Sequence, residues 1–214
     1  MWSALVPIVG LSLYASSVAL LIAVLLGVPL GAWVGLYAKA SKRWWELLLY
    51  TGMGFPTVVV GLLVYLLLSR SGPLGALGWL FTPRAIIFSQ VIIALPMVAS
   101  LTQTAFEALN PNLRMLLRSW AVSPWQEMWT LLSEARGGML VAIIAAFGRI
   151  FSEVGAVMLV GGNIQGQTRV LTTAIVLETR QGNFDLALAL GALLLTISAL
   201  INALVLRLGK PRIL

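Results

Sequence analysis

The chain has 214 residues, of which 60% are hydrophobic and only 10% are charged. Soluble globular domains are about 45–50% apolar and about 25% charged, so this composition excludes a soluble enzyme, a disordered chain, a collagen and a coiled coil. The absence of cysteine and histidine removes disulfides, thiol catalysis and the usual ligands of zinc, haem and iron–sulfur clusters, and we expect no metal site of these kinds. The net charge of +7 is spread in small groups at the ends of apolar segments, which indicates membrane topology and not nucleic-acid binding.

Five apolar segments are long enough to cross a membrane, because a spanning helix needs about 20 apolar residues. They cover residues 7–37, 46–68, 85–105, 138–160 and 186–206. The sequence therefore predicts an all-α polytopic membrane protein with one domain over residues 1–214. Glycine and proline interrupt several segments, where they either only kink and pack the helices or form a functional hinge.

Cationic residues divide unequally between the two predicted sides of the membrane. Nine fall on one side: Lys39, Lys42, Arg43, Arg114, Arg118, Arg136, Arg207, Lys210 and Arg212. Four fall on the other: Arg70, Arg84, Arg169 and Arg180. Because cytoplasmic loops carry an excess of Lys and Arg, this asymmetry predicts an external N-terminus and a cytoplasmic C-terminus.

The predicted cytoplasmic stretch 108–136 is longer than a connection between adjacent spans requires. Asn110-Pro111 is a typical helix start. Ser123-Pro124 begins a second short helix, in which Ser123 and Gln126 have capping-box spacing. The apolar stripe of this helix includes Trp125, Met128 and Trp129. Such helices either dock into a partner or lie flat on the lipid surface.

The predicted external stretch 161–168 is rich in glycine and amide side chains, including Asn163, and ends at Thr168. Its backbone N–H groups can turn toward an anion, but the same composition is equally typical of a flexible loop. The pattern after Val170 predicts a short amphipathic helix that ends near Gly182. That helix is too short to span and is expected at the outer interface.

Arg149 and Glu153 are the clear charges within the predicted fourth span. Four residues apart on one helix, they share a face and can form an ion pair. Intramembrane charges are costly, so this pair marks either an anion route or a structural lock between helices.

The function can be narrowed by what the chain lacks. No phosphate-binding loop is present, and five spans are few for a complete translocation path. A dimer driven by a separate motor, docked on residues 108–136, accounts for both observations. Two alternatives stay open: an autonomous anion channel or carrier that uses Arg149 and Glu153, and a non-transporting scaffold that recruits a partner.

The stretch from Arg114 to Leu140 resembles the cytoplasmic Glu-Ala-Ala loop of binding-protein-dependent ABC importer permeases. In that family the loop reads Glu-Ala-Ala, three residues, then Gly; the equivalent positions are Met115, Leu116, Leu117 and Ala121. Segments 148–156, 161–164 and 168–175 resemble the molybdate, sulfate and tungstate permeases. Within that group, residues 177–191 are most similar to the tungstate-type branch, and the resemblance covers about residues 11–208.

The resemblance implies a type I importer in the plasma (inner) membrane of a prokaryote. Two copies of this chain would work with two cytoplasmic ATPase subunits, which bind ATP and Mg²⁺, and with an external oxyanion-binding protein. The chain would be a transport subunit and not an enzyme, with tungstate as the expected oxyanion and molybdate or sulfate as alternatives. The implied ATPase contacts are Ala121, Ser123, Trp125, Met128 and Trp129. The candidates for the anion route or gate are Arg149, Glu153, Asn163 and Thr168.

Overall fold

The computed structural model describes residues 2–38 and 41–208, so Lys39, Lys210 and Arg212 of the predicted charge asymmetry lie outside the described residues. These two ranges contain α-helices and a short 3-10 helix, and no strand. The elements are α1 (Trp2–Tyr37), α2 (Lys42–Met53), α3 (Thr57–Leu68), η1 (Gly75–Leu77), α4 (Pro83–Glu107), α5 (Pro111–Ser119), α6 (Pro124–Phe151), α7 (Gly155–Gly161), α8 (Leu171–Arg180) and α9 (Phe184–Leu208). The predicted all-α class is confirmed for this part of the chain.

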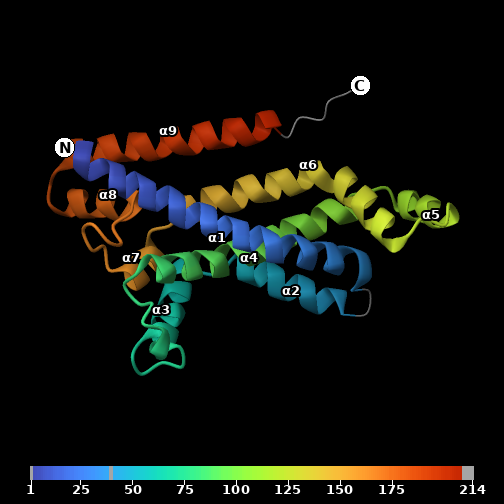
Figure 1. The fold of residues 1–214 in the computed structure, drawn as a ribbon, viewed down its shortest axis with the longest axis horizontal. Coiled ribbons are helices and arrows are strands. Elements are labelled where there is room, and N and C mark those ends of the chain that lie inside the picture. Colours follow the sequence, from blue (N-terminus) through green and yellow to red (C-terminus); the bar gives the residue numbers. More distant parts are fainter. Residues whose placement is uncertain (1, 39–40, 209–214) are drawn as a thin grey trace.

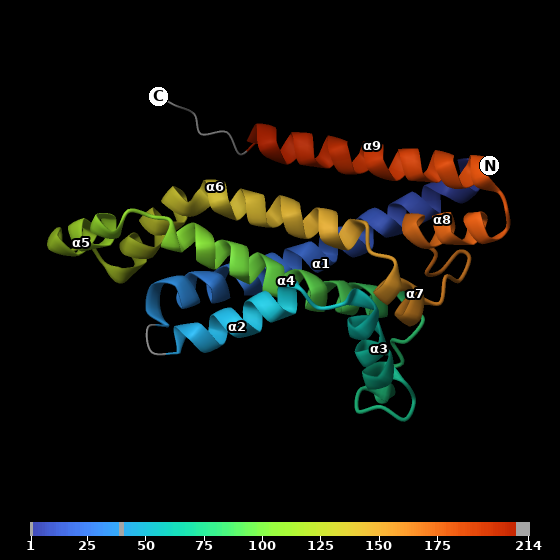
Figure 2. The ribbon, with the colours of Figure 1, turned by 180° about the vertical axis from the view of Figure 1, so that it is seen from behind.

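Among the described residues, four helices are long and apolar enough to cross a membrane: α1, α4, α6 and α9. The pair α2 and α3 passes the same test only together, and the chain bends by 95° between them. Counting that pair as one span gives the five predicted spans. The four long helices extend along the long axis of the molecule, whereas α3 projects away from it (Figures 1 and 2).

The bend between α2 and α3 corrects the prediction of one continuous span over residues 46–68. α2 ends at Met53 and α3 begins at Thr57, directly after Pro56. A proline ring disfavours helical backbone in the residue before it, so Phe55 cannot easily continue the helix. At this position glycine and proline therefore end one helix and begin another, and do not only kink a continuous helix or pack it against its neighbours.

The start and the end of α6 correct a second prediction. The expected short helix at Ser123-Pro124 is the beginning of a 28-residue helix that continues through the membrane segment. The helix then ends at Phe151, so the predicted span 138–160 is wrong at both boundaries. α6 continues through Gly138, where a Cβ would overlap Ala105 of α4; the glycine allows the two helices to approach closely.

The most extensive helix–helix contact joins α1 to α4. α1 presents a small residue at every fourth position: Ala15, Ala19, Ala23, Gly27, Gly31 and Gly35. A Cβ on Gly27 would lie 3.0 Å from Val98 Cγ1, and a Cβ on Gly31 would overlap the carbonyl oxygen of Ala99. Small residues let helix backbones approach within van der Waals contact, which is the main source of helix association in lipid.

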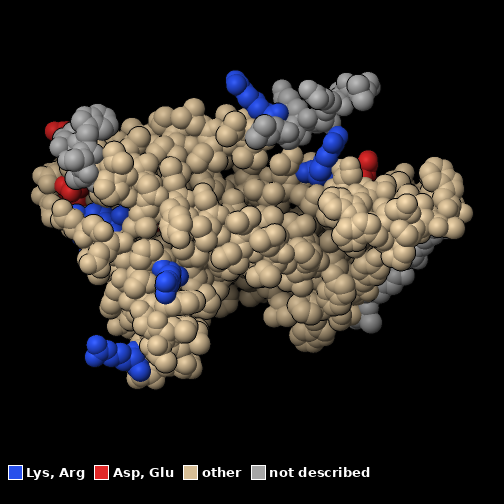
Figure 3. Space-filling view, viewed as in Figure 1, with Lys and Arg blue, Asp and Glu red and all other residues tan. Residues whose placement is uncertain are grey.

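The two ends of the molecule differ in their contents. α5 and the first turns of α6 form one end, and α7 and α8 lie at the other (Figure 1). α9 runs along the outside of the bundle, and only 6% of the residues in its most apolar stretch are buried. Between the ends, the face in Figure 3 is covered mainly by uncharged side chains, as a lipid-facing surface requires.

Candidate functional site

Residues 108–136 form a helical hairpin, in which α5 turns into the first turns of α6. The predicted capping box at this turn is confirmed. Ser123 N donates to Gln126 Oε1 at 2.9 Å, and Gln126 N donates to Ser123 Oγ at 3.3 Å. Pro124 occupies the first turn, where its missing N–H costs nothing. These local interactions fix the residue at which α6 begins and therefore the direction in which the hairpin projects.

Ala121 forms the turn of the hairpin in a left-handed conformation, with φ of +51°. The N–H of Trp120 donates to Leu116 O at 3.2 Å, and the N–H of Val122 reaches Leu117 O at 3.5 Å. Glycine is the residue that adopts this conformation without a steric cost. The structure thus gives a physical reason for a glycine at this position in the Glu-Ala-Ala loop that the sequence resembles.

The hairpin exposes large apolar side chains, both along α5 and at its tip, residues 120–125. Trp125 is 70% exposed, Trp120 is 68% exposed and Met115 is 71% exposed. The rings of Trp125 and Trp129 pack edge to face with their centroids 5.7 Å apart, while Met128 is half-buried. Exposed tryptophans on a rigid helix are typical anchors of a protein interface, so Trp125 is a better candidate contact than Met128.

Arg114 connects the hairpin to the end of α1, a contact that the sequence did not predict. Its Nε donates to Glu127 Oε1 at 2.7 Å, and its Nη1 donates to the Leu36 carbonyl at 2.8 Å. The guanidinium also lies over the Tyr37 ring, 4.6 Å from the centroid. One side chain therefore ties α5, α6 and α1 together, using the planar fork that only arginine provides.

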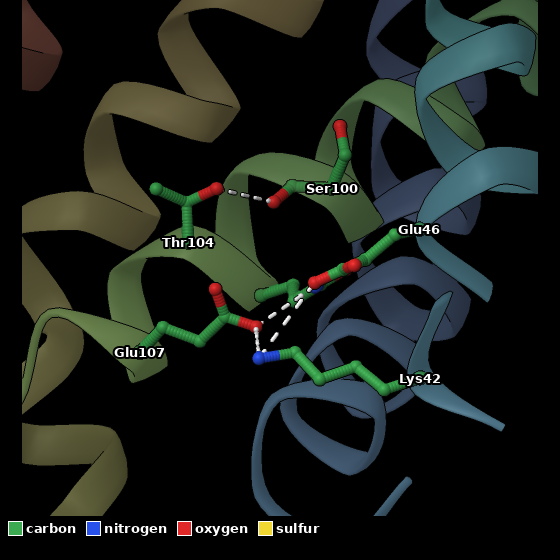
Figure 4. Close-up of polar contacts among 6 residues, drawn as sticks. Lys42, Glu46, Ser100, Thr104 and Glu107 are labelled. Atoms are coloured by element: carbon green, nitrogen blue, oxygen red, sulfur yellow. Dashed lines mark hydrogen bonds and ion pairs between the residues drawn. The ribbon is translucent and has the colours of Figure 1, made fainter. Parts of the chain in front are cut away.

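A second polar cluster ties α2 to α4 (Figure 4). Gln103, which is fully buried, donates to Glu46 Oε1 at 3.1 Å and to Glu107 Oε1 at 2.8 Å. Lys42 Nζ lies 3.0 Å from Glu107 Oε1 and 3.7 Å from Glu46 Oε1. Each carboxylate is thus compensated by an ammonium and an amide, which holds the bent second span against α4.

The predicted ion pair between Arg149 and Glu153 is wrong. α6 ends at Phe151, so the two residues do not share a helix face. Arg149 is exposed and, within the described part of the chain, forms no ion pair with Glu153. Glu153 is only 7% exposed, and its Oε1 accepts the N–H of Ala156 at 3.0 Å in the first turn of α7. The two charges therefore have separate surroundings.

Asn163 and Thr168 lie in the loop between α7 and α8. Thr168 is fully buried; its hydroxyl donates to the Gly161 carbonyl and accepts the N–H of Ile164. Arg169 Nε donates to Asn163 Oδ1 at 3.3 Å. The N–H groups of residues 167, 168 and 169 all donate to the Ile164 carbonyl, so these three amides are engaged within the loop and do not form an anion nest.

The structure is thus a bundle of apolar helices, long enough to span a membrane, with an aromatic-tipped hairpin at one end. Residues 27–211 match the family described as the binding-protein-dependent transport system inner membrane component, and the chain belongs to this family. It is thus a multi-pass protein of the inner membrane, and the fold class that the sequence predicted is confirmed.

Three relatives cover most of the chain. It is 44% identical over 205 residues to a probable anion ABC transporter permease protein of Haloferax volcanii, over 94% of this chain and 88% of the relative. It is 37% identical to a tungstate uptake system permease protein of Peptoclostridium acidaminophilum, over 92% of this chain and 87% of the relative. It is 43% identical to a tungstate uptake system permease protein of Campylobacter jejuni, over 75% of this chain and 67% of the relative.

Proposed function

We propose that this chain is the permease subunit of an ATP-driven importer that translocates tungstate. The observation that carries this proposal is the similarity, over most of the chain, to permease proteins named for tungstate uptake. Molybdate and sulfate stay as alternatives, because tetrahedral oxyanions of equal charge differ little in their interaction with a permease. Selectivity then belongs to an external binding protein, where an anion can be surrounded by hydrogen-bond donors.

In this proposal two copies of the chain form the pathway, and two ATPase subunits bind ATP and Mg²⁺. The hairpin end faces the cytoplasm and the N-terminus is external, as the charge asymmetry predicts. An ATPase groove receives the hairpin tip, with Trp125 as its apolar anchor. The short turn at Ala121 and the Arg114 contact would transmit ATPase movement to α1, because both join the hairpin rigidly to its surroundings.

The first test is purification of the tagged chain from its native membranes in mild detergent, with mass spectrometry of what stays bound. We expect an ATP-binding subunit in equal amount, and ATP-dependent uptake of radiolabelled tungstate by the reconstituted complex. A chain that purifies alone and conducts anions in vesicles without nucleotide would overturn the importer proposal in favour of a channel. A bound partner without flux of any oxyanion would instead favour a scaffold.

Arg149 is the candidate on this chain for contact with the anion during transport. Its side chain is exposed and does not pair with Glu153, so its positive charge is available to a passing oxyanion. We expect Arg149→Ala to assemble normally and to lose most tungstate uptake. An assembled variant with wild-type uptake would remove Arg149 from the pathway.

A further inference from the structure

A small polar cavity lies beside the break between α6 and α7. Its volume is about 10 Å³, the size of one water molecule or one small ion. The polar residues that line it come from four parts of the fold: Ser12 and Ser16 of α1, Gln90 of α4, Glu153 of the break and Thr172 of α8. All five are buried.

Gln90, which lines this cavity, has a buried acceptor without a partner. Its Nε2 donates to the Ile150 carbonyl at 3.0 Å and to Ser16 Oγ at 3.3 Å, which fixes the orientation of the amide. Its Oε1 is buried and has no hydrogen-bond partner among the described residues. The whole side chain is 4% exposed, so bulk water does not satisfy this oxygen.

Glu153 adds a negative charge to the same cavity. One carboxylate oxygen accepts the Ala156 N–H, and Thr172 Oγ1 donates to the Glu153 backbone carbonyl at 2.8 Å. Neither contact supplies a positive charge, and among the described residues no Lys or Arg forms an ion pair with Glu153. A buried carboxylate is costly unless a charge of opposite sign compensates it.

We propose that this cavity binds one Na⁺ ion, held by the Glu153 carboxylate, Gln90 Oε1 and the neighbouring hydroxyl oxygens. A water molecule would satisfy Gln90 but would leave the carboxylate uncompensated, whereas a monovalent cation satisfies both. The one carboxylate that lines the cavity balances a single positive charge and would leave Ca²⁺ with an excess charge, whereas Mg²⁺ retains several waters, for which this volume has no room. Broken helices in membrane proteins supply such ion sites, since their unwound segments bring oxygen atoms together.

The bound ion would lock the α6–α7 break against α1, α4 and α8. It would also neutralise a carboxylate that otherwise repels an oxyanion, a consequence that rests on the proposed function. The binding itself does not, so binding can be measured without any transport. A failed uptake assay with intact Na⁺ binding would therefore count against the transport proposal alone.

Binding of ²²Na⁺ to the full chain, purified with its bound partners in nanodiscs, tests the proposal. We expect saturable binding of about one ion per chain that choline does not displace. Glu153→Gln should weaken this binding by about tenfold or more, because it removes the charge that compensates the ion. Glu178→Gln is the matched control: Glu178 lies on α8, outside the cavity, and accepts a hydrogen bond from Asn183, so binding should not change.

A second variant, Gln90→Met, tests the same cavity if Glu153→Gln fails to assemble. Gln90→Met retains the length of the side chain and removes the free oxygen, and it should also weaken Na⁺ binding severalfold. Absence of saturable binding in the assembled wild-type protein would overturn the proposal and leave an ordered water in the cavity. Equal binding in the wild type and in both variants would overturn it as well.

Discussion

Ala121 holds a backbone conformation that suits glycine. With φ of +51°, its Cβ approaches the adjacent carbonyl oxygen, at a cost of about 1–2 kcal/mol relative to a relaxed residue. We expect Ala121→Gly to stabilise the protein by up to about 1 kcal/mol. The relief of strain exceeds the extra backbone entropy that glycine loses on folding. Thermal unfolding in detergent, followed by circular dichroism, measures this as a higher melting temperature.

The matched control for that substitution is Ala108→Gly. Ala108 also follows a helix, but its φ is −73°, so glycine there relieves no strain and should lower the melting temperature slightly. If both glycine variants shift the melting temperature downward by the same amount, the left-handed turn at Ala121 stores no strain.

At the level of single residues, local interactions were predictable and distant ones were not. The Ser123 cap was predicted correctly, because its partner Gln126 lies three positions away. The contacts of Arg114 join residues 13 and 78 positions apart, and no sequence pattern signals them. The Arg149–Glu153 pair was predicted from helical spacing, and it failed because the helix ends between the two residues.

At the level of helices, the existence of five apolar segments followed from hydropathy, but their breaks did not. Gly54 and Pro56 interrupt the second segment and Ser152 and Glu153 follow the end of α6, but hydropathy averaged over a segment of about 20 residues passes over both breaks. One signal was available and was missed: small residues at every fourth position from Ala15 to Gly35 identify the face of α1 that meets α4.

Gly31 tests the importance of that face. A Cβ at this position would overlap the Ala99 carbonyl and would lie 2.9 Å from Thr102 Cβ, so Gly31→Ala requires the two helices to separate. We expect a loss of about 3 kcal/mol or more, near the upper end for overpacking. The yield of monodisperse protein in size-exclusion chromatography and its melting temperature should both fall.

Gly10→Ala is the control on the same helix. A Cβ at Gly10 meets no atom within 4 Å, so the higher helix propensity of alanine should leave stability unchanged or raise it by up to about 1 kcal/mol. Similar losses in both variants would show that the loss at Gly31 does not come from the contact with α4.

At the level of the whole molecule, the hairpin and the α8 end are connected by one continuous set of contacts. Arg114 joins the hairpin to the end of α1, and the small residues of α1 carry that helix along α4. Ser12 of α1 then accepts the N–H of Leu171 at the start of α8. Packed helices, and not linkers, therefore join the hairpin to the α8 end of the molecule.

In the proposed importer, the tip of the hairpin is the place where the ATPase subunit contacts the bundle. Trp125 is 70% exposed there, and truncation of a central interface tryptophan typically costs about 2 kcal/mol or more, a loss of about thirtyfold in affinity. We expect Trp125→Ala to insert and fold normally but to lose ATPase subunits during purification. Quantitative mass spectrometry of the co-purified subunits measures the loss.

Trp44 provides a control of equal exposure. It is also 70% exposed, but it lies in the first turn of α2, outside the hairpin, so Trp44→Ala removes the same surface without touching the proposed anchor. Retention of ATPase in the Trp44 variant together with its loss in the Trp125 variant would locate the contact at the hairpin tip. Equal retention in both variants would place the docking surface elsewhere, and Arg114 and Ala121 would then serve only to hold the fold.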